Sequence, residues 1–164
     1  MFDLDRFHQA QDTAGDGFAD ALRELQAGRK TSHWIWYIFP QLRGLGTSPM
    51  AVAYGLAGPE EGAAYLEDRV LTARLIDAAS AVRAHVAPPR ASPARLETVM
   101  GSHIDAQKLV SSMTLFAHLA RRLDTPVRPD LGVLARDAEA ILAAAAAEGY
   151  ARCSFTEKAL GLGH

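Results

Sequence analysis

The chain has one cysteine, Cys153, among its 164 residues. A single cysteine cannot form an intramolecular disulfide, and Cys153 has no cysteine neighbours at a metal-binding spacing. The N-terminal sequence MFDLDRFHQA carries acidic residues and lacks the apolar run of a signal peptide or an anchor. These absences lead us to expect a cytoplasmic protein that has no membrane partner.

The chain also lacks an excess of charge of either sign. It has 17 Lys and Arg against 19 Asp and Glu, a formal charge of −2 and a pI near 6.3. Nucleic-acid backbones are bound by clustered basic residues, and no such cluster interrupts this balance. We therefore expect no nucleic-acid partner. Apolar residues are 49% and charged residues 22% of the chain, values typical of soluble globular proteins.

Motifs for metals and cofactors are missing as well. The histidines are scattered, and no pair has the four-residue helical spacing with a nearby carboxylate that a zinc helix needs. In GLGTSP, Pro49 stands where a dinucleotide fingerprint has its third glycine, and GRKTS lacks the upstream glycine of a Walker loop. We expect no metal and no cofactor.

The apolar residues that are present follow a helical period almost throughout, and no segment of any length alternates as a strand does. A chain of this length supports one hydrophobic core. We therefore predict an all-α fold of about seven to nine helices without a sheet, in a single domain over residues 1–164. The longest predicted helices run from Leu71 to Val86, from about Ile104 to Ala120 and from about Leu131 to Ala147.

The segment from Lys30 to Ser48, KTSHWIWYIFPQLRGLGTS, contains both tryptophans of the chain. Its helical part must stop before Pro40, which disfavours the helical conformation in the residue that precedes it. Trp34, Trp36 and Tyr37 cannot all lie on one face of so short a helix, so at least one ring is expected near a surface or cleft. The alternative is that both tryptophans are core anchors.

Polar residues around these rings are candidate ligand contacts. Lys30 and Ser32 precede the short helix, whose free N–H groups favour an anion. Gln41 is a long donor and acceptor. Gly46 and Ser48 belong to a glycine-bearing loop that opens the next helix, with Ser48 as its N-cap. Each has a structural alternative, such as a cap, a turn or a solvated charge.

His33, Asp105, Lys108 and Ser112 complete the candidate set. Histidine titrates near neutral pH, so His33 is a candidate acid, base or ligand contact. The other three are spaced three and four residues apart beside the apolar face of their helix. If this strip faces the aromatic segment, its carboxylate, ammonium and hydroxyl groups converge with the rings, as in a small-molecule pocket. A local ion pair between Asp105 and Lys108 is the alternative.

Three segments resemble a known protein family. They are GRKTSHWIWYIFPQLRGLGTSPMAVAYGL, EEGAAYLEDRVLTARLIDAA and MGSHIDAQKLVSSMTLF. The chain is similar over residues 7–119 to a bacterial all-helical family of unknown function, domain of unknown function 1810, whose members are often mislabelled calpastatin. The resemblance implies the fold and leaves the chemistry open.

The sequence thus favours a binding pocket for a small anionic, nucleotide-like metabolite, with hydrolysis as the reaction to be named first. The alternative is a protein-protein interaction module that uses an exposed aromatic block. Whether a reaction occurs, and which protein partner the chain has, stay open. The candidate catalytic residues are His33 and Asp105, and the candidate ligand-binding residues are Lys30, Ser32, Trp34, Trp36, Tyr37, Gln41, Gly46, Ser48, Lys108 and Ser112.

Overall fold

The computed structural model describes residues 1–88 and 91–162, which form ten helices and no β-strand. Six of these helices have seven residues or more, so the all-α prediction is confirmed. The last helix, α10, lies in a segment for which no helix was predicted. The helices are α1 (Asp5–Asp12), α2 (Phe18–Gln26), α3 (Ile35–Ile38), α4 (Pro49–Tyr54), α5 (Pro59–Glu67), α6 (Arg69–Val86), α7 (Leu96–Met100), α8 (His103–Leu123), α9 (Pro129–Ala147) and α10 (Ser154–Ala159).

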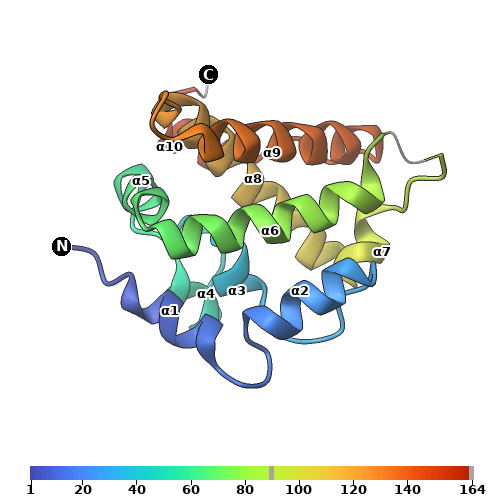
Figure 1. Ribbon diagram of the computed structural model, residues 1–164, viewed down its shortest axis with the longest axis horizontal. Helices are drawn as coiled ribbons and strands as arrows, with labels where there is room; N and C mark the ends of the chain where they lie inside the picture. Colours follow the sequence, from blue (N-terminus) through green and yellow to red (C-terminus); the bar gives the residue numbers. More distant parts are fainter. Residues whose placement is uncertain (89–90, 163–164) are drawn as a thin grey trace.

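Helix α8 is the central helix of the fold. It contacts α3, α5, α7, α9 and α10, and the run from Leu109 to Ala117 is buried throughout. Helix α9 packs along both α8 and α6, and α6 packs on α2. In Figure 1, α9, α6 and α2 lie in order from top to bottom, with α8 behind α6. A helix that is apolar on nearly all sides must be enclosed by other helices, so the sequence of α8 explains its central position in the fold.

The short helix α3 places the aromatic segment inside the protein. It contacts α1, α4, α6 and α8, and Ile35, Ile38 and Phe39 are buried. The helix ends before Pro40 as predicted. After it, the chain pairs briefly with a later segment, because the N–H of Leu56 donates to the carbonyl of Gln41 at 3.0 Å. This pairing fixes the backbone on which the Gln41 side chain stands.

Helix ends follow the capping residues of the sequence. The Ser48 hydroxyl accepts from the N–H of Ala51 at 3.2 Å, which confirms Ser48 as the N-cap of α4. Ser102 caps α8 in the same way. Gly101, between α7 and α8, has φ of 84°, and a Cβ there would lie 2.7 Å from the carbonyl oxygen of Lys30. Glycine therefore permits the close approach between this turn and the start of the aromatic segment.

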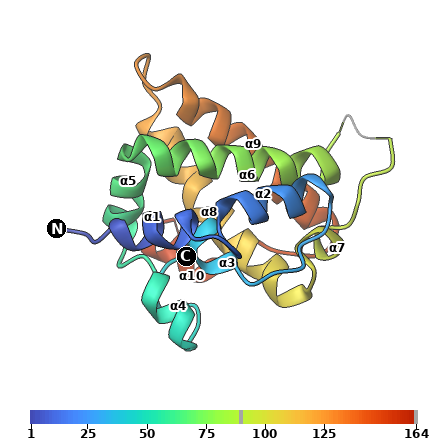
Figure 2. The ribbon, with the colours of Figure 1, turned by 60° about the horizontal axis from the view of Figure 1, so that its bottom comes forward.

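Two further features complete the outline. Figure 2 shows α4 extending away from the other helices at the lower edge of the view. The sequence also predicts that Pro88 and Pro89 end the helix that begins near Leu71: Pro88 follows α6, and Pro89 lies outside the described residues. No helix in residues 1–88 and 91–162 has both the length and the apolar character needed to cross a membrane.

Candidate functional site

A buried carboxylate, that of Glu24, organises the start of the aromatic segment. Its Oε1 accepts from the backbone N–H groups of Thr31 (2.7 Å) and Ser32 (2.9 Å) and from the indole Nε1 of Trp34 (3.0 Å). Its Oε2 accepts from the Ser32 hydroxyl at 2.6 Å. Burial raises the pKa of Glu24, but these donors outweigh burial and bring the pKa from 4.5 down to about 2. The carboxylate therefore stays charged inside the protein and holds the loop.

Next along the chain, Lys30 joins the aromatic segment to α8. Its side chain is 6% exposed, and its Nζ lies 2.8 Å from Oδ2 of Asp105. Nζ also donates to the carbonyl of Ser32 and lies 4.9 Å from the ring centroid of Trp34. A charged group this deeply buried needs a paired opposite charge. Asp105 supplies this charge, and the ammonium group of Lys30 is further held by the carbonyl of Ser32 and the ring of Trp34.

Lys108, which shares the same carboxylate, is held much less closely. Its Nζ lies 3.8 Å from Oδ1 of Asp105, beyond hydrogen-bond distance, and 5.3 Å from the ring centroid of Trp36. No hydrogen bond from this ammonium group to any described residue is present. Lys30 and Lys108 carry one positive charge each and Asp105 one negative charge. The three groups together therefore have a single net positive charge, which is located at Lys108.

Two buried polar atoms near this bridge lack a partner within the described part of the chain. They are Nε1 of Trp36 and Oγ of Ser112. Ser112 stands one helical turn after Lys108 on α8, and Trp36 stands beneath the ammonium group of Lys108. A buried polar atom without a hydrogen bond is costly, so such atoms mark places where water or a ligand atom is expected. Both lie at the junction of α3 and α8.

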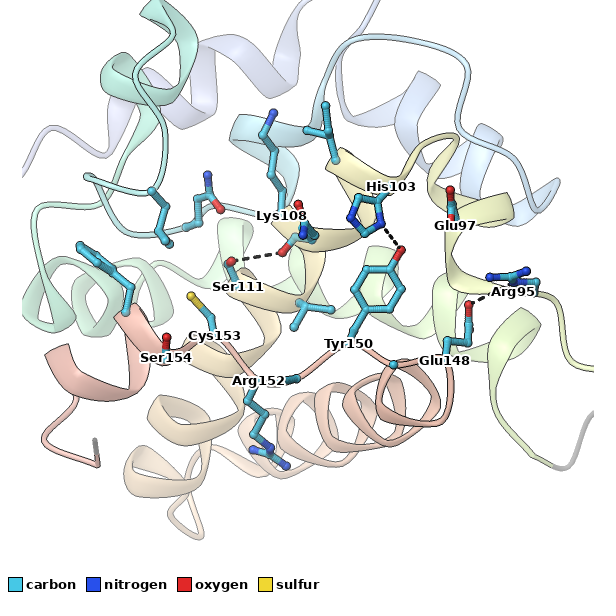
Figure 3. A pocket seen from close by; sticks show the side chains of 18 residues that line it. Arg95, Glu97, His103, Lys108, Ser111, Glu148, Tyr150, Arg152, Cys153 and Ser154 are labelled. Atoms are coloured by element: carbon cyan, nitrogen blue, oxygen red, sulfur yellow. Dashed lines mark hydrogen bonds and ion pairs between the residues drawn. The ribbon is translucent and has the colours of Figure 1, made fainter. Parts of the chain in front are cut away.

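A cleft of about 650 Å³ runs beside the first half of α8. Its opposite wall is the segment of residues 148–155, here called the C-terminal strap, which follows α9 (Figure 3). This volume is within the range of small-molecule sites. The lining residues are Gln41, Leu45, Arg95, Glu97, His103, Ile104, Gln107, Lys108, Val110, Ser111, Glu148, Gly149, Tyr150, Ala151, Arg152, Cys153, Ser154 and Phe155.

Hydrogen bonds tie the C-terminal strap to the helices behind it. The N–H of Leu96 donates to both carboxylate oxygens of Glu148, at 3.0 and 2.8 Å, so a residue far along the chain caps α7. The N–H of Cys153 donates to the Thr114 hydroxyl of α8 at 3.2 Å. These contacts fix the width of the cleft, since one end of the strap is held on α7 and the other on α8.

One end of the cleft contains a histidine-tyrosine pair. Nδ1 of His103 and the hydroxyl of Tyr150 are 2.9 Å apart, and Figure 3 shows the tyrosine ring facing the imidazole. Burial and the nearby carboxylates of Glu97 and Glu148 raise the pKa of Tyr150. The hydroxyl therefore keeps its proton at neutral pH and is available as a hydrogen-bond donor or acceptor.

Apolar side chains and Gln41 form the other end. Phe155 is 44% exposed and lies against the backbone of Gly44, where a Cβ would be 2.9 Å from its ring. Leu45 lies beside it in the lining. Gln41 is only 7% exposed, and its side-chain amide makes no hydrogen bond to another residue of 1–88 and 91–162. The amide is not among the fully buried unpaired groups, so its polar atoms open to the cleft and can contact a ligand.

The structure brings only part of the predicted set into this cleft. Lys108 and Gln41 line it, and Asp105 stands behind Lys108. Trp36 is half-buried under Lys108, and Ser112 is fully buried one turn away. The set is therefore centred on Lys108 rather than on the aromatic rings.

The other predicted residues lie elsewhere or have internal partners. Trp34 is fully buried against Glu24, and the Tyr37 hydroxyl donates to backbone carbonyls, with burial raising its pKa to about 12. Lys30 is paired with Asp105. The remaining residues, Ser32, His33, Gly46 and Ser48, do not line the cleft.

The alternative of an exposed aromatic block is contradicted by Trp34 and Tyr37, which are 0% and 6% exposed. The expectation that at least one ring lies near a surface or cleft is met by Trp36, which is half-buried under Lys108 of the cleft lining. The physical reason is α3 itself. A helix of four residues surrounded by α1, α4, α6 and α8 has no face turned fully to solvent. Trp34 is therefore a core anchor, as in the alternative interpretation of the tryptophans. Its indole N–H donates to the carboxylate of Glu24.

Several residues of the site were not predicted. Glu24 reads as an ordinary helical glutamate in α2, and nothing in its spacing identifies it as the partner of Trp34. The C-terminal strap follows an alanine-rich helix and carries no motif. His103 and Tyr150 are 47 residues apart. One available signal was Gly149–Tyr150, a glycine and an aromatic residue directly after a helix end, which is typical of a chain reversal.

Fold and cleft define an all-α protein with an open polar cleft beside its central helix. The chain belongs to the family described as "Protein of unknown function (DUF1810)", which matches residues 1–128. It is similar to the conserved hypothetical protein Rv1873 from Mycobacterium tuberculosis, for which a crystal structure exists. The two share 41% sequence identity and a TM-score of 0.64, over 81% of this chain and 84% of that chain. No curated protein matches the chain.

The family match confirms the resemblance seen in the sequence, and the matched residues include only one of the two walls of the cleft. Lys108, Gln41 and His103 lie within the matched residues 1–128, whereas the C-terminal strap follows them. The two walls of the cleft therefore come from different parts of the chain, one inside and one outside the matched segment.

Proposed function

We propose that the protein binds a small anionic, ring-bearing metabolite in the cleft beside α8. The observation that carries this proposal is Lys108. Its ammonium group lines the cleft, makes no hydrogen bond within the described residues and shares its carboxylate with the better-placed Lys30. An ammonium group has three donors and no acceptor, so its complement is an acceptor-rich anion.

Gln41 supports the same ligand chemistry. Its side-chain amide, which makes no hydrogen bond to another described residue, lines the cleft together with Lys108. An amide offers both donors and an acceptor, so it can orient a head group that Lys108 attracts. The indole N–H of Trp36, for which residues 1–88 and 91–162 provide no acceptor, lies below Lys108 and is a further donor in this region.

The other cations of the lining are less suited to hold the anion than Lys108, because Arg152 is paired and Arg95, which is 70% exposed, is more strongly screened by water than Lys108, which is 22% exposed. Arg152 forms an ion pair with Glu139 and points away from the His103–Tyr150 pair in Figure 3. Arg95 lies 3.7 Å from a carboxylate oxygen of Glu148. The apolar and aromatic side chains at the two ends of the cleft offer surfaces for a ring. Nucleotides and aromatic carboxylates both satisfy these requirements.

Hydrolysis is a second proposal, supported by one observation. The His103–Tyr150 hydrogen bond sets an imidazole in the cleft with its other nitrogen available for proton transfer. The hydroxyls on α8 favour binding over a covalent mechanism, because Ser111 donates to the carbonyl of Gln107 and Ser112 is fully buried. Incubation of the protein with each compound that binds, followed by chromatography, tests this activity, and an unchanged His103→Gln rate would refute the role of His103.

The test of binding is a thermal-shift screen of nucleotides, sugar phosphates and aromatic carboxylates. A ligand at about 100 times its Kd stabilises the native state by about 2.7 kcal/mol, or roughly 5–10 °C for a chain of this size. We expect the shift to disappear in Lys108→Met and to weaken in Gln41→Leu, with the Tm of the free protein little changed in Lys108→Met.

A matched control is Lys158→Met, which removes the same charge from an exposed position of α10 outside the cleft. This variant should keep the full shift. Loss of the shift in both lysine variants would mean that net charge alone attracts the compounds. A ligand that binds Lys108→Met as well as the wild type would refute the site.

A further inference from the structure

The charges around Lys108 restrict the kind of anion that fits. Resting on the proposed function, we infer that Asp105, within the Lys30–Asp105–Lys108 bridge, shifts the preference of the site toward a singly charged head group, a carboxylate above all. A dianionic head group, such as a phosphate monoester at pH 8, loses more affinity to Asp105 at this position than a carboxylate does.

The first step of the argument is the charge balance. Asp105 is in contact with both lysines, at 2.8 Å from Lys30 and 3.8 Å from Lys108. The three side chains are 6%, 17% and 22% exposed, so water screens them only in part. Their single net positive charge is matched by one negative charge on the ligand. A second negative charge is repelled by Asp105, and the next cation of the lining, Arg95, already lies 3.7 Å from a carboxylate oxygen of Glu148.

The second step is the position of Asp105 relative to a bound anion. An anion in contact with Lys108 lies about 3 Å from its Nζ, and therefore about 6 Å from a carboxylate that is 3.8 Å from the same atom. At that distance, with an effective dielectric constant of about 40–80, the repulsion lowers affinity about 3- to 10-fold per ligand charge. The fold-loss of affinity caused by Asp105 is therefore squared for a dianion relative to a monoanion. We call this effect of Asp105 a charge filter.

The third step concerns the rest of the ligand. Gln41 adds an uncharged amide to the same wall, which suits the two oxygens of a carboxylate without adding charge. Apolar side chains of the lining, including Leu45 and Phe155, suit an uncharged ring. The class that these groups fit is a ring-bearing carboxylate, with the carboxylate on Lys108 and the ring along the cleft.

Two probes that share a ring test this inference. Benzoate carries one charge, and phenyl phosphate carries two at pH 8, because the second pKa of a phosphate ester is about 6. Binding of each is measured by NMR titration, with the indole N–H of Trp36 as reporter, since its ring lies under Lys108. We expect the wild type to bind both probes, and the ratio of their two affinities reports the charge around Lys108.

Three variants give the charge dependence. Asp105→Asn leaves two positive charges, so the affinity ratio of phenyl phosphate to benzoate should rise about 3- to 10-fold. The double variant Lys30→Met, Asp105→Asn removes the buried pair together. Because Lys30 lies behind Asp105 and so farther from the ligand, its removal offsets most of the change, and the ratio should lie slightly above the wild-type value and below that of Asp105→Asn. Asp124→Asn makes the same charge change just after the far end of α8 and should leave the ratio unchanged.

The outcomes separate the inference from the proposed function. An unchanged ratio in Asp105→Asn, or a double variant that behaves like Asp105→Asn, would overturn the charge filter while leaving the anion site in place. If neither probe binds the wild type, or if Lys108→Met binds both probes equally well, the anion site itself is refuted and the inference falls with it. The double variant keeps the test decisive if Asp105→Asn alone unfolds, because a ratio above the wild-type value supports the filter and a ratio equal to or below it overturns it.

Discussion

Replacing Glu24 with Gln should cost the protein about 3 kcal/mol of unfolding free energy at pH 7. The carboxylate accepts four hydrogen bonds from Thr31, Ser32 and Trp34. The amide keeps the shape of the side chain and one acceptor oxygen, but it loses the negative charge that makes these hydrogen bonds strong. The magnitude follows from the pKa, which is about 2 in the folded protein against 4.5 ordinarily. Each pKa unit corresponds to about 1.36 kcal/mol.

The contribution of Glu24 to the unfolding free energy should decrease as the pH is lowered. Because the folded pKa of Glu24 is depressed, its contribution is fully present above pH 4.5 and is lost as pH falls toward 2. Of roughly 3 kcal/mol at pH 7, about 1.4 kcal/mol should remain at pH 3. The difference in stability between the wild type and Glu24→Gln should therefore shrink by about half or more between these two pH values.

The assay is urea unfolding of both proteins at pH 7 and pH 3, followed by far-UV circular dichroism and by tryptophan fluorescence. Trp34 donates to Glu24, so its emission reports directly on this contact. Asp124→Asn, at an exposed position, serves as the control for a general change in net charge. An equal loss of stability at both pH values would refute the reasoning, because it would show that the loss comes from replacing an acceptor oxygen by an NH2 group and not from the charge of the carboxylate.

Three further predictions concern packing and pairing. Gly62→Ala should destabilise the α5–α8 contact by about 1–3 kcal/mol in urea unfolding, since the added Cβ would lie 2.6 Å from a methyl carbon of Leu119; an unchanged midpoint would contradict this. Arg83→Met should cost about 2 kcal/mol because it leaves the buried Asp137 without its 2.8 Å partner, and adding Asp137→Leu should recover most of that loss in the same assay. Ser48→Ala should lower stability by about 1 kcal/mol through loss of the α4 cap, whereas Ser48→Asp should retain it in thermal unfolding.

Local signals predicted much of the fold. Helical periodicity predicted an all-α fold of about seven to nine helices, where the described residues have ten, and Pro40 predicted the end of α3 and Ser48 the start of α4. Such features depend on residues a few positions apart, so they are visible in sequence. The exception, α10, has six residues and follows a strap with no periodic pattern, which leaves too few positions for a period to show.

The candidate site was predicted less well, and the reason lies in the distance between its parts. Residue type and spacing pointed to Lys108, Gln41 and Asp105, because a polar strip beside an apolar helix face is a local pattern. The same reasoning gave Trp34 a ligand-binding role, although its indole is satisfied by Glu24 inside the protein. Whether an aromatic ring faces solvent depends on neighbours from other helices, and these are not encoded in its own segment.

The sequence by itself therefore determined that the protein is all-helical, where most helices begin and end, and that it belongs with the family of unknown function. Those properties arise from backbone propensity, caps and helical period, which act over a few residues. Only the tertiary structure decided that Lys30 claims the Asp105 carboxylate more closely than Lys108 does, and that residues 148–155 close a cleft beside α8. These are contacts between segments far apart in the chain, and they depend on how α7, α8 and α9 pack together, because packing alone sets which charges meet and which remain free for a ligand.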